Sequence, residues 1–573
     1  KVLTFSDSSS IQSTKKYYYA KLESLNNSSG GSHINPVFLR TFFSRFACYP
    51  TTEPPSCNER TCSHTGWYSS PQNQLNIYPS GVTYGAVVEG FGENFENGAI
   101  EHAYTVQVDQ GAINMMSGFG VDMIYGSPMI NDSYYNGREI EQTIYQKNKL
   151  GQLLPVKKLE YTLKIDSRRS IDVRAAAVNW QYEYCTTLPN APVESAINAF
   201  QVMLYLHQSR WVYVDTVKET TFDENGSEAM ISYSYYFYDN ENHMMPSRTE
   251  MKNSLAEHTV VQQKYSLDFG TLTSGDAKSQ GIKHLLDNSI TTTEIEKSIF
   301  KKNADGTNLR LLGSTFTSYK TTIPLPDTIY QVENATPLTD FVAAVNLGGA
   351  ISIDSRYKKQ LSVHEYSSMG NVLEQRKEND IKLAYIWDYK NNYSVAQVNN
   401  AEQVDIAYTS FEADGKGNWV FSGAPSVDAT APTGGKAYSL NGFSISKAGL
   451  NSSGTYIVSY WSKNGAQTVN STSSVSGRTV GSWTFYEHKV VNPVGGTITV
   501  SGSGTIDELR LYPLNAQMIT QTYEPLIGIT SQCDALNRIT YYEYDAFNRL
   551  RLVRDQDKNV IKKIDYQYQQ PSN

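Results

Sequence analysis

The chain has 573 residues and a formal net charge of -8, and it contains 41 tyrosines and 39 glycines. One hydrophobic core does not normally organise this length, so several structural units are expected. Its lysines and arginines form no basic stripe, and no apolar run approaches the roughly 20 residues that span a bilayer, which argues against nucleic acid as a partner and against a transmembrane segment. Tyrosine and threonine favour pleated sheets, so the fold class is predicted to be mainly β.

Three of the five cysteines, Cys48, Cys57 and Cys62, lie close together in a stretch rich in proline, serine and threonine. In an oxidising compartment they are candidates for a local disulfide. The alternatives are free thiols and a zinc site, which would need His64 as a further ligand. Residues 1–165, which contain this cluster, are predicted to form a β-rich N-terminal region.

Aromatic residues lead into turns at irregular intervals along the next part of the chain. The turns lie near Gly151, Asp223-Glu224-Asn225-Gly226, Asp305-Gly306 and Ser367-Ser368-Met369-Gly370, and Asn97-Gly98 marks another hairpin upstream. Asp, Asn and Ser can bond the backbone ahead of them, and Gly tolerates a positive φ, so each site is typical of a β-hairpin. Residues 166–403 are therefore predicted to be degenerate hairpin repeats.

The character of the sequence changes between residues 404 and 518, where glycine and serine rise and the tyrosine-led turns vanish. Short alternating segments occur at 437–440, 455–461, 481–486, 497–500 and 506–512. Regular strand spacing over little more than a hundred residues is typical of a β-sandwich. We therefore predict a β-sandwich inserted into the series of hairpins.

The tryptophans of this predicted β-sandwich differ in their expected roles. Trp461 shares a strand face with Ile457 and Ser459, so it is expected in the core. Trp419 and Trp483 are candidates for glycan binding, since an exposed indole offers a flat apolar face to a pyranose ring. The alternative for both is core packing.

The clearest repeat lies in residues 519–573. Asp-Ala-Leu-Asn-Arg at 534–538 is echoed by Asp-Ala-Phe-Asn-Arg at 545–549, and Asp-Lys-Asn follows at 557–559. In each copy an Asp precedes a residue suited to a positive φ, and apolar residues alternating with charged ones follow. The pattern predicts consecutive hairpins of one sheet.

The segment Tyr-Asp-Ala-Phe-Asn-Arg-Leu at 544–550 resembles the YD repeat of bacterial RHS proteins, whose pattern is Tyr-Asp-x-x-Gly-Arg-Leu; Asn548 replaces the glycine. Residues 523–528 and 385–389 resemble large secreted YD-repeat proteins that use type IX secretion. The specific match covers about a tenth of the chain, and residues 166–403 are interpreted as its degenerate copies.

This resemblance implies an extended or spiralling antiparallel sheet located outside the cell or on the bacterial surface, with a secretion-machinery component as one partner. In the family such a sheet can wrap into a shell that carries a C-terminal toxin, or it can display surface structures. The Asp-Pro-x-Gly core motif that closes such shells is absent from this sequence, so we expect any toxin to lie outside it.

Residues 404–518 resemble jelly-roll carbohydrate-binding modules through Phe411-Glu412, the strand at 455–461 and the closing segment at 506–511. In those modules the first and last strands lie together and often share a structural calcium ion. The resemblance implies Glu412 and Asp507 as its ligands, because calcium prefers hard oxygen donors. The alternative is that both are solvated edge carboxylates, and no other cofactor is expected.

Catalytic signatures are missing from the sequence: no nucleophile elbow, phosphate loop or complete nucleotide fingerprint occurs. We therefore expect a non-catalytic scaffold of the RHS/YD-repeat type, secreted or on the cell surface, that acts in recognition or display of a glycan or protein. One alternative is the shell or delivery part of a polymorphic toxin whose catalytic domain lies C-terminal to this chain. A second is a polysaccharide-degrading enzyme that uses a carboxylate pair such as Asp507-Glu508.

Overall fold

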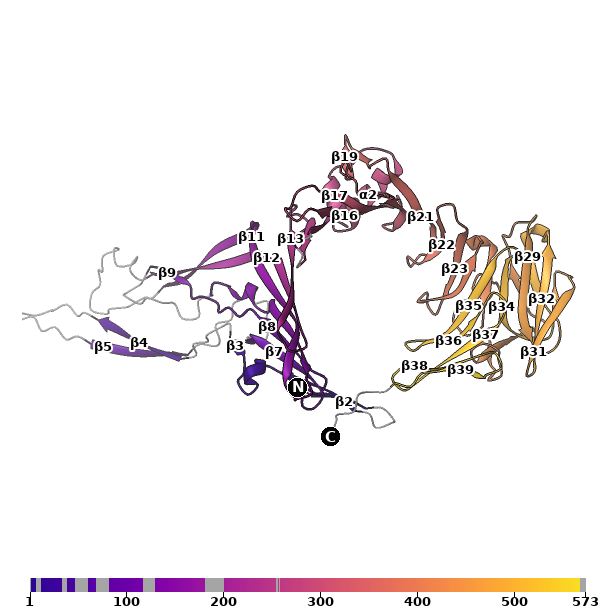
Figure 1. Ribbon diagram of the computed structural model, residues 1–573, viewed down its shortest axis with the longest axis horizontal. Helices are drawn as coiled ribbons and strands as arrows, with labels where there is room; N and C mark the ends of the chain where they lie inside the picture. Colours follow the sequence, from indigo (N-terminus) through magenta and orange to yellow (C-terminus); the bar gives the residue numbers. More distant parts are fainter. Residues whose placement is uncertain are drawn as a thin grey trace, which may run out of the picture. The chain divides into compact units, whose positions relative to one another are not determined.

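The computed structural model describes residues 2–6, 12–32, 39–46, 60–67, 82–116, 129–180, 200–253, 256 and 258–566. Its strands pair antiparallel in large sheets, which confirms the mainly β fold class (Figure 1). The chain forms two compact units, the first from residues 1–6, 10–261 and 301–309 and the second from residues 7–9, 262–300 and 310–573. The disulfide hypothesis for Cys48, Cys57 and Cys62 falls on residues or side chains outside the described part of the chain.

The first unit is built on an antiparallel sheet in which β1, β2, β7, β8, β10, β11, β12, β13 and β14 pair one after another. Strand β9 pairs with β12, while β3 pairs with β6 and β4 pairs with β5. The bounds are β1 (Val2–Ser6), β2 (Gln12–Tyr18), η1 (Leu22–Ser24), β3 (Gly30–Ser32), β4 (Leu39–Phe46), β5 (Arg60–Trp67), β6 (Val82–Tyr84), β7 (Ala86–Phe91), β8 (Ala99–Tyr104), β9 (Ile113–Met116), η3 (Ser133–Tyr135), β10 (Glu139–Lys147), β11 (Leu153–Trp180), β12 (Phe200–Phe222), β13 (Glu228–Phe237) and β14 (Arg248–Lys252).

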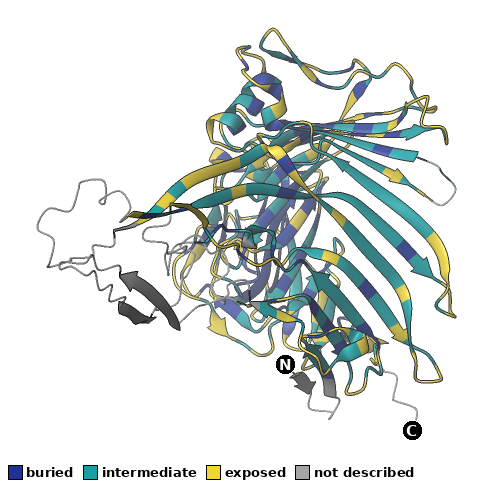
Figure 2. Cartoon of the chain, turned by 90° about the vertical axis from the view of Figure 1, so that its left-hand side faces the viewer, coloured by how far each residue is buried: buried dark blue, intermediate teal, exposed yellow. Residues whose placement is uncertain are grey.

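Strands β10, β12 and β13 of this sheet lack the regular alternation of buried and exposed residues that a sheet packed on a core would show. Along β13, all of which the structure describes, no residue is buried, and the long strands in Figure 2 are mainly of intermediate exposure. Ion pairs cross from strand to strand instead: Lys158 to Glu141, at 2.9 Å, and Lys218 to Glu160, at 2.9 Å. Such cross-strand pairs contribute about 0.2–1 kcal/mol each, so this part of the sheet depends on many small lateral contacts.

The expected boundary between residues 165 and 166 does not divide the structure. It falls inside β11, which runs without interruption in its pairing with β12 apart from bulges near Thr162 and Asp166. The cysteine cluster ends far upstream, at Cys62, and the backbone continues through residues 165 and 166 as one strand. The N-terminal region and the first hairpins therefore belong to one sheet.

The second unit contains a meander in which β17, β18, β21, β22, β23 and β24 pair in turn, followed by β35, β36, β37, β38 and β39. The division between the units falls within β15 (His258–Tyr265). The other bounds are η4 (Ser266–Phe269), α2 (Ala277–Asp287), β16 (Glu294–Lys302), β17 (Arg310–Tyr319), β18 (Pro326–Val332), β19 (Val345–Leu347), β20 (Ala350–Ser352), β21 (Tyr357–Tyr366), β22 (Val372–Lys377), β23 (Lys382–Asp388), β24 (Tyr393–Asn399), β35 (Gln517–Glu524), β36 (Gly528–Cys533), β37 (Ile539–Tyr544), β38 (Leu550–Arg554) and β39 (Val560–Lys563).

Helix α2 is amphipathic and packs one face against the rest of the second unit. Its Ile282 and Leu285 are buried, and Gly281 lies so close to β17 that a Cβ atom would come within 2.1 Å of the Tyr319 carbonyl oxygen. Glycine is therefore required for this helix to pack on the strand. No helix in the part of the chain that the structure describes is both long and apolar enough to cross a bilayer.

Residues 400–516, called the insert below, leave the meander after β24 and return to it at β35. Strands β24 and β35 pair directly, with Asn399 opposite Gln517, so the meander continues as if the insert were absent. The insert contains η5 (Gln403–Asp405), β25 (Ala407–Thr409), β26 (Ser426–Val427), β27 (Lys436–Ser439), β28 (Ser444–Lys447), β29 (Thr455–Ser462), β30 (Thr468–Val469), β31 (Ser474–Val480), β32 (Trp483–Val491), η6 (Val494–Gly496), β33 (Ile498–Ser501) and β34 (Thr505–Pro513).

The strands of the insert form a seven-stranded sheet, to which β25 and β34 belong as a pair, and a three-stranded sheet of β28, β33 and β30. One hydrophobic core joins the two sheets: Tyr456, Val458 and Leu511 come from the larger sheet, and Ile445 and Val500 come from the smaller. The alternating segments predicted within residues 437–512 all lie in or overlap these strands.

One five-residue turn recurs through both units. The N–H of its first residue donates to the carbonyl of the fifth, the N–H of the fourth donates to the carbonyl of the first, and the fourth residue has a positive φ. The copies span 148–152, 223–227, 303–307, 367–371, 534–538, 545–549 and 555–559. This is a type I turn followed by a bulge, a hairpin connection that matches the twist of paired strands.

The first side chain of the turn holds its geometry. Asp545 Oδ1 accepts the N–H groups of Phe547 (2.9 Å) and Arg549 (3.0 Å), and its Oδ2 accepts Arg549 Nε at 2.8 Å. Asp534 does the same with Leu536 and Arg538. The Asp and Arg of the repeat are thus partners in one ion pair across the turn.

Replacing Asp545 with Ala should loosen this turn, because two backbone N–H groups and Arg549 lose their acceptor. The turn should therefore open more often, and amide hydrogen exchange in the peptide that contains residues 545–549 should accelerate about tenfold. Asp545→Asn keeps an acceptor for the backbone and should exchange more slowly than Asp545→Ala. Equal exchange rates in the two variants would show that the side chain does not hold the turn.

Candidate functional site

The insert is seated on the meander through two apolar clusters. In one, Ile457 and Tyr512 of the insert pack with Ile386, Val398 and Met518 of the meander. The other cluster also joins the insert to the meander. Its insert residues are Ala437, Trp461 and Trp483, and its meander residues are Cys533, Ile539 and Tyr541 of β36 and β37. Figure 1 shows β29 and β34 beside β35–β37 accordingly. The larger sheet of the insert is therefore covered on one face by the meander.

Arg510, on β34, lies between these clusters and is only 1% exposed. Its Nη2 and Nε donate to Glu508 Oε1 at 2.8 and 3.1 Å, and Nη2 also donates to Thr520 Oγ1 at 2.5 Å. Glu508, which is 2% exposed, accepts further hydrogen bonds from the hydroxyls of Tyr408 (2.8 Å) and Thr520. The buried carboxylate is thus compensated by one guanidinium and by hydroxyl donors.

The remaining donors of Arg510 reach the first C-terminal hairpin turn. Nη1 donates to the carbonyl oxygen of Asp534 at 3.1 Å and to Asn537 Oδ1 at 2.9 Å, and Nη2 donates to the carbonyl oxygen of Cys533 at 3.3 Å. Asn537 is the positive-φ residue of that turn. One side chain of the insert therefore makes several hydrogen bonds to a repeat turn of the meander.

A second buried carboxyl, Asp507, lies next to this cluster and is 0% exposed. Its Oδ2 lies 2.9 Å from the N–H and 3.0 Å from the hydroxyl of Thr433, and that hydroxyl lies 3.2 Å from Glu508 Oε2. Burial, with the neighbouring charge of Glu508, raises the pKa of Asp507 well above its usual range. A protonated Asp507 can donate to Thr433 Oγ, which then donates to Glu508, so one shared proton satisfies all three groups.

Glu412 and Asp507, the candidate calcium ligands, both contact the segment 433–436. Glu412 Oε1 accepts the N–H groups of Gly435 and Lys436 at 2.8 and 2.5 Å, and burial raises its pKa. Within the described residues no three His, Cys, Asp or Glu side chains converge to hold a metal. N–H donors of the segment 433–436 thus already bind one oxygen of each carboxylate, and calcium binding by Glu412 and Asp507 stays a prediction.

The two candidate glycan-stacking tryptophans are not exposed. Trp419 is 3% exposed, and its Nε1 lies 3.4 Å from the Leu509 carbonyl oxygen. Trp483 is 1% exposed and packs against the meander, with Lys463 Nζ 5.0 Å from its ring centroid. Neither indole presents a free face to a sugar, because the cores of the insert and of its seat need large apolar side chains. Trp461, expected in the core, is buried as predicted.

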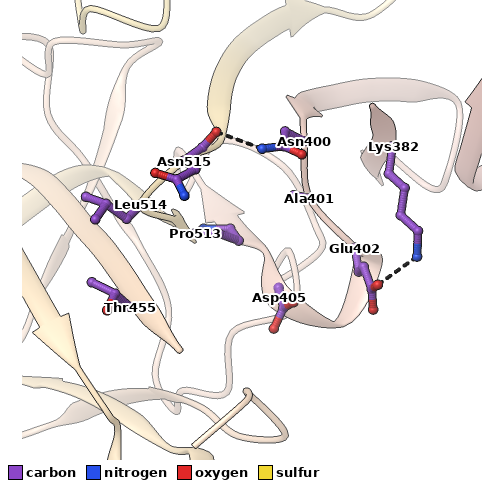
Figure 3. Close-up of a pocket in the computed structure, with 9 residues that line it drawn as sticks. All are labelled: Lys382, Asn400, Ala401, Glu402, Asp405, Thr455, Pro513, Leu514 and Asn515. Carbon is purple, nitrogen blue, oxygen red and sulfur yellow. Dashed lines mark hydrogen bonds and ion pairs between the residues drawn. The ribbon is translucent and has the colours of Figure 1, made fainter. Parts of the chain in front are cut away.

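An open pocket of about 500 Å³ lies where the insert leaves and rejoins the meander (Figure 3). Residues 400–402 and Asp405 line one side, and Thr455 with residues 513–515 lines the other. Asn400 Nδ2 donates to the Asn515 carbonyl oxygen at 3.0 Å, which ties the two connecting segments together. Lys382 Nζ lies 2.7 Å from Glu402 Oε1, and this contact raises the pKa of Lys382.

Sequence reasoning missed Arg510, Thr433, Tyr408 and the pocket. A signal for Arg510 was present, since a lone Arg between Leu509 and Leu511 in a strand with apolar neighbours needs a buried partner. Thr433 lies in a loop and Asn515 in the three-residue connection between β34 and β35, where no periodic pattern marks a function. Their roles arise from contacts between segments far apart in the chain.

Comparisons with known proteins give no family assignment. No family model matches the chain, and no curated protein matches it. Among solved structures, crystal structures of TcdB2-TccC3 with Cdc42 and of TcdB2-TccC3 without the hypervariable C-terminal region are similar over 82% of this chain, at 8% identity and TM-scores of 0.30 and 0.29. This chain spans 20% of the length of those chains.

A further similar structure is an exo-beta-1,3-galactanase from Phanerochaete chrysosporium with galactose. It has 11% identity and a TM-score of 0.12, with 89% of this chain and 95% of that chain covered. Similarities at these TM-scores carry no argument about what the present chain binds or does.

Replacing Arg510 with Met should unseat the insert, because Glu508 would remain buried without its charge partner. Breaking a buried pair in this way costs about 3–5 kcal/mol, whereas removing both charges is close to neutral. The double variant Glu508→Gln/Arg510→Met should therefore recover most of the loss in thermal unfolding measurements. A double variant as unstable as Arg510→Met would mean that the hydrogen bonds of Arg510 to the meander, and not the charge pair, dominate.

The raised pKa of Asp507 predicts how the free energy of unfolding changes with pH. The folded chain keeps a proton that the unfolded chain loses above about pH 4, so this group lowers the free energy of unfolding as pH rises from there. Asp507→Asn cannot lose a proton, so its stability relative to the native chain should increase as pH rises above about 4.

Asp545→Asn is the matched control, because the hydrogen bond from Arg549 lowers the pKa of Asp545. The ionised Asp545 stabilises the fold above its unfolded pKa, and that stabilisation is lost as pH falls. Relative to the native chain, this variant should therefore lose stability as pH rises through about 3–4. Denaturation at several pH values measures both trends, and parallel slopes would contradict the assignment for Asp507.

Proposed function

We propose that this chain is a non-catalytic scaffold of the RHS/YD-repeat type, located outside the cell or on its surface, which holds the insert in a fixed position for recognition of a glycan or a protein. The observation that carries the proposal is the attachment of the insert to the meander. Arg510 and two apolar clusters tie it to consecutive strands of the meander. A recognition module on a rigid support loses little conformational entropy on binding, which favours affinity.

The recurrent turn supports the family part of the proposal. The pattern Tyr-Asp-x-x-Gly-Arg-Leu places its Asp and Arg where Asp545 and Arg549 form their ion pair, and its Gly where Asn548 has a positive φ. Secretion by the type IX route, with a secretion-machinery partner, is part of the same proposal. The jelly-roll type of the insert belongs to it as well.

A second candidate is the wall of a toxin-delivery shell, which the sheet of the first unit favours. Strands β10 to β13 carry half-exposed side chains on both faces, as a wall between two aqueous compartments would. A hypervariable catalytic domain encoded after residue 573 would favour this shell, and a sorting domain there would favour the scaffold.

The test of the main proposal uses the full 573-residue chain on a glycan array and against extracts of surface proteins, with a polysaccharide hydrolysis assay in parallel. We expect binding without hydrolysis. We expect chelation with EDTA to leave binding unchanged, because N–H donors occupy Glu412 and Asp507. Release of reducing sugars by the purified chain would contradict the non-catalytic assignment, and loss of binding on chelation would restore the calcium site.

A further inference from the structure

The pocket in Figure 3 contains hydrogen-bonding groups that the protein itself does not use. Asp405 Oδ1 accepts the hydroxyl of Tyr456 at 2.7 Å, and its other oxygen has no partner among the described residues. The side chains of Thr455 and Asn515 likewise make no hydrogen bond to the described part of the chain. The pocket therefore offers a carboxylate, an amide and a hydroxyl to a ligand.

The apolar part of the pocket is aliphatic. Pro513 and Leu514 lie beside the polar groups, and Leu514 is 42% exposed. A wall of this kind suits C–H groups that alternate with hydroxyls, as they do on a pyranose ring. A volume of about 500 Å³ is within the usual range for small-ligand sites and holds one or two sugar units.

The charges around the pocket select against anions. Lys382 is paired with Glu402 and lies 3.2 Å from Glu374, so its charge is already compensated. The carboxylate of Asp405 accepts one hydrogen bond, from the Tyr456 hydroxyl, and Lys447, whose pKa burial lowers, also interacts with it electrostatically. A ligand carboxylate placed here would meet like charge, whereas a ligand hydroxyl or ammonium group would find an acceptor.

We propose that this pocket binds a pyranose sugar without a carboxylate group. Asp405 accepts hydrogen bonds from the sugar hydroxyls, Asn515 and Thr455 complete the polar contacts, and Leu514 covers the C–H face. The inference rests on the proposed recognition function. It locates the binding site at this pocket instead of at Trp419 or Trp483. The pocket is held open by the bonds that fix its rim, from Tyr456 to Asp405 and from Asn400 to the Asn515 carbonyl oxygen.

The experiment measures binding to the full chain by saturation-transfer NMR and calorimetry. The probes are the methyl glycosides of glucose, galactose and mannose, with glucosamine, glucuronic acid and galacturonic acid. At least one neutral or amino sugar should bind with a Kd near 1 mM, and both uronic acids should bind at least tenfold more weakly. Uronic acids that bind as well as or better than the neutral sugars would overturn the charge argument.

Asn515→Ala and Asp405→Asn should each weaken sugar binding about fivefold or more, because each removes a hydrogen-bonding or charged partner. Asn225→Ala, which truncates an exposed asparagine in a turn of the first unit, is the matched control and should bind as the native chain does. Circular dichroism should be unchanged in all three variants, because the side chains of Asn515 and Asn225 make no hydrogen bond to the described part of the chain and Asp405→Asn keeps an oxygen that can accept the Tyr456 hydroxyl.

The outcomes separate this inference from the proposed function. If the full chain binds glycans on the array while Asn515→Ala and Asp405→Asn bind them unchanged, recognition occurs elsewhere and the pocket inference fails alone. If no sugar binds but a surface protein does, the pocket inference also fails and the scaffold proposal stands. If the chain binds neither glycans nor proteins, both are wrong.

Discussion

A two-stranded ribbon cannot bury enough surface to be stable alone, and this constraint governs the whole molecule. The recurrent five-residue turn reverses the chain with a residue of positive φ at its fourth position, so each strand is delivered antiparallel to the one before. Within the meander of the second unit, consecutive strands from β21 to β24 and from β35 to β39 then pair with one another. A long meander follows from one local device repeated many times.

The same constraint explains how an insert can interrupt the meander without breaking it. Because β24 and β35 pair directly, the edge left by β24 is closed by the strand that follows the insert. Arg510 then connects the insert to the turn after β36. A buried ion pair of this kind adds little net stability compared with apolar packing, but its forked donors accept only one arrangement of carbonyl groups. Its contribution is therefore to the position of the insert more than to its strength of attachment.

Much of the architecture could be predicted from local sequence, because the turn chemistry is local. The Asp, Asn and Gly residues at 223–226 and 534–549 mark their own backbone geometry, and alternating segments mark the strands of the insert. The candidate site could not be predicted in this way. Trp419 and Trp483 are of the residue type that stacks on sugars. Whether each indole is buried depends on which distant strand covers it, and the pattern of a single strand does not contain that information.

The sheet of the first unit and the sheets of the second unit also differ in the interactions that stabilise them. In the second unit, apolar clusters form the core of the insert and its contact with the meander. That unit is therefore stabilised by apolar packing within itself. In the first unit, β10 to β13 rely on lateral ion pairs and leave both faces half-exposed. Lateral ion pairs weaken with salt, whereas buried apolar contacts do not. The first sheet is therefore the part whose stability responds most to ionic conditions and to anything that covers one of its faces.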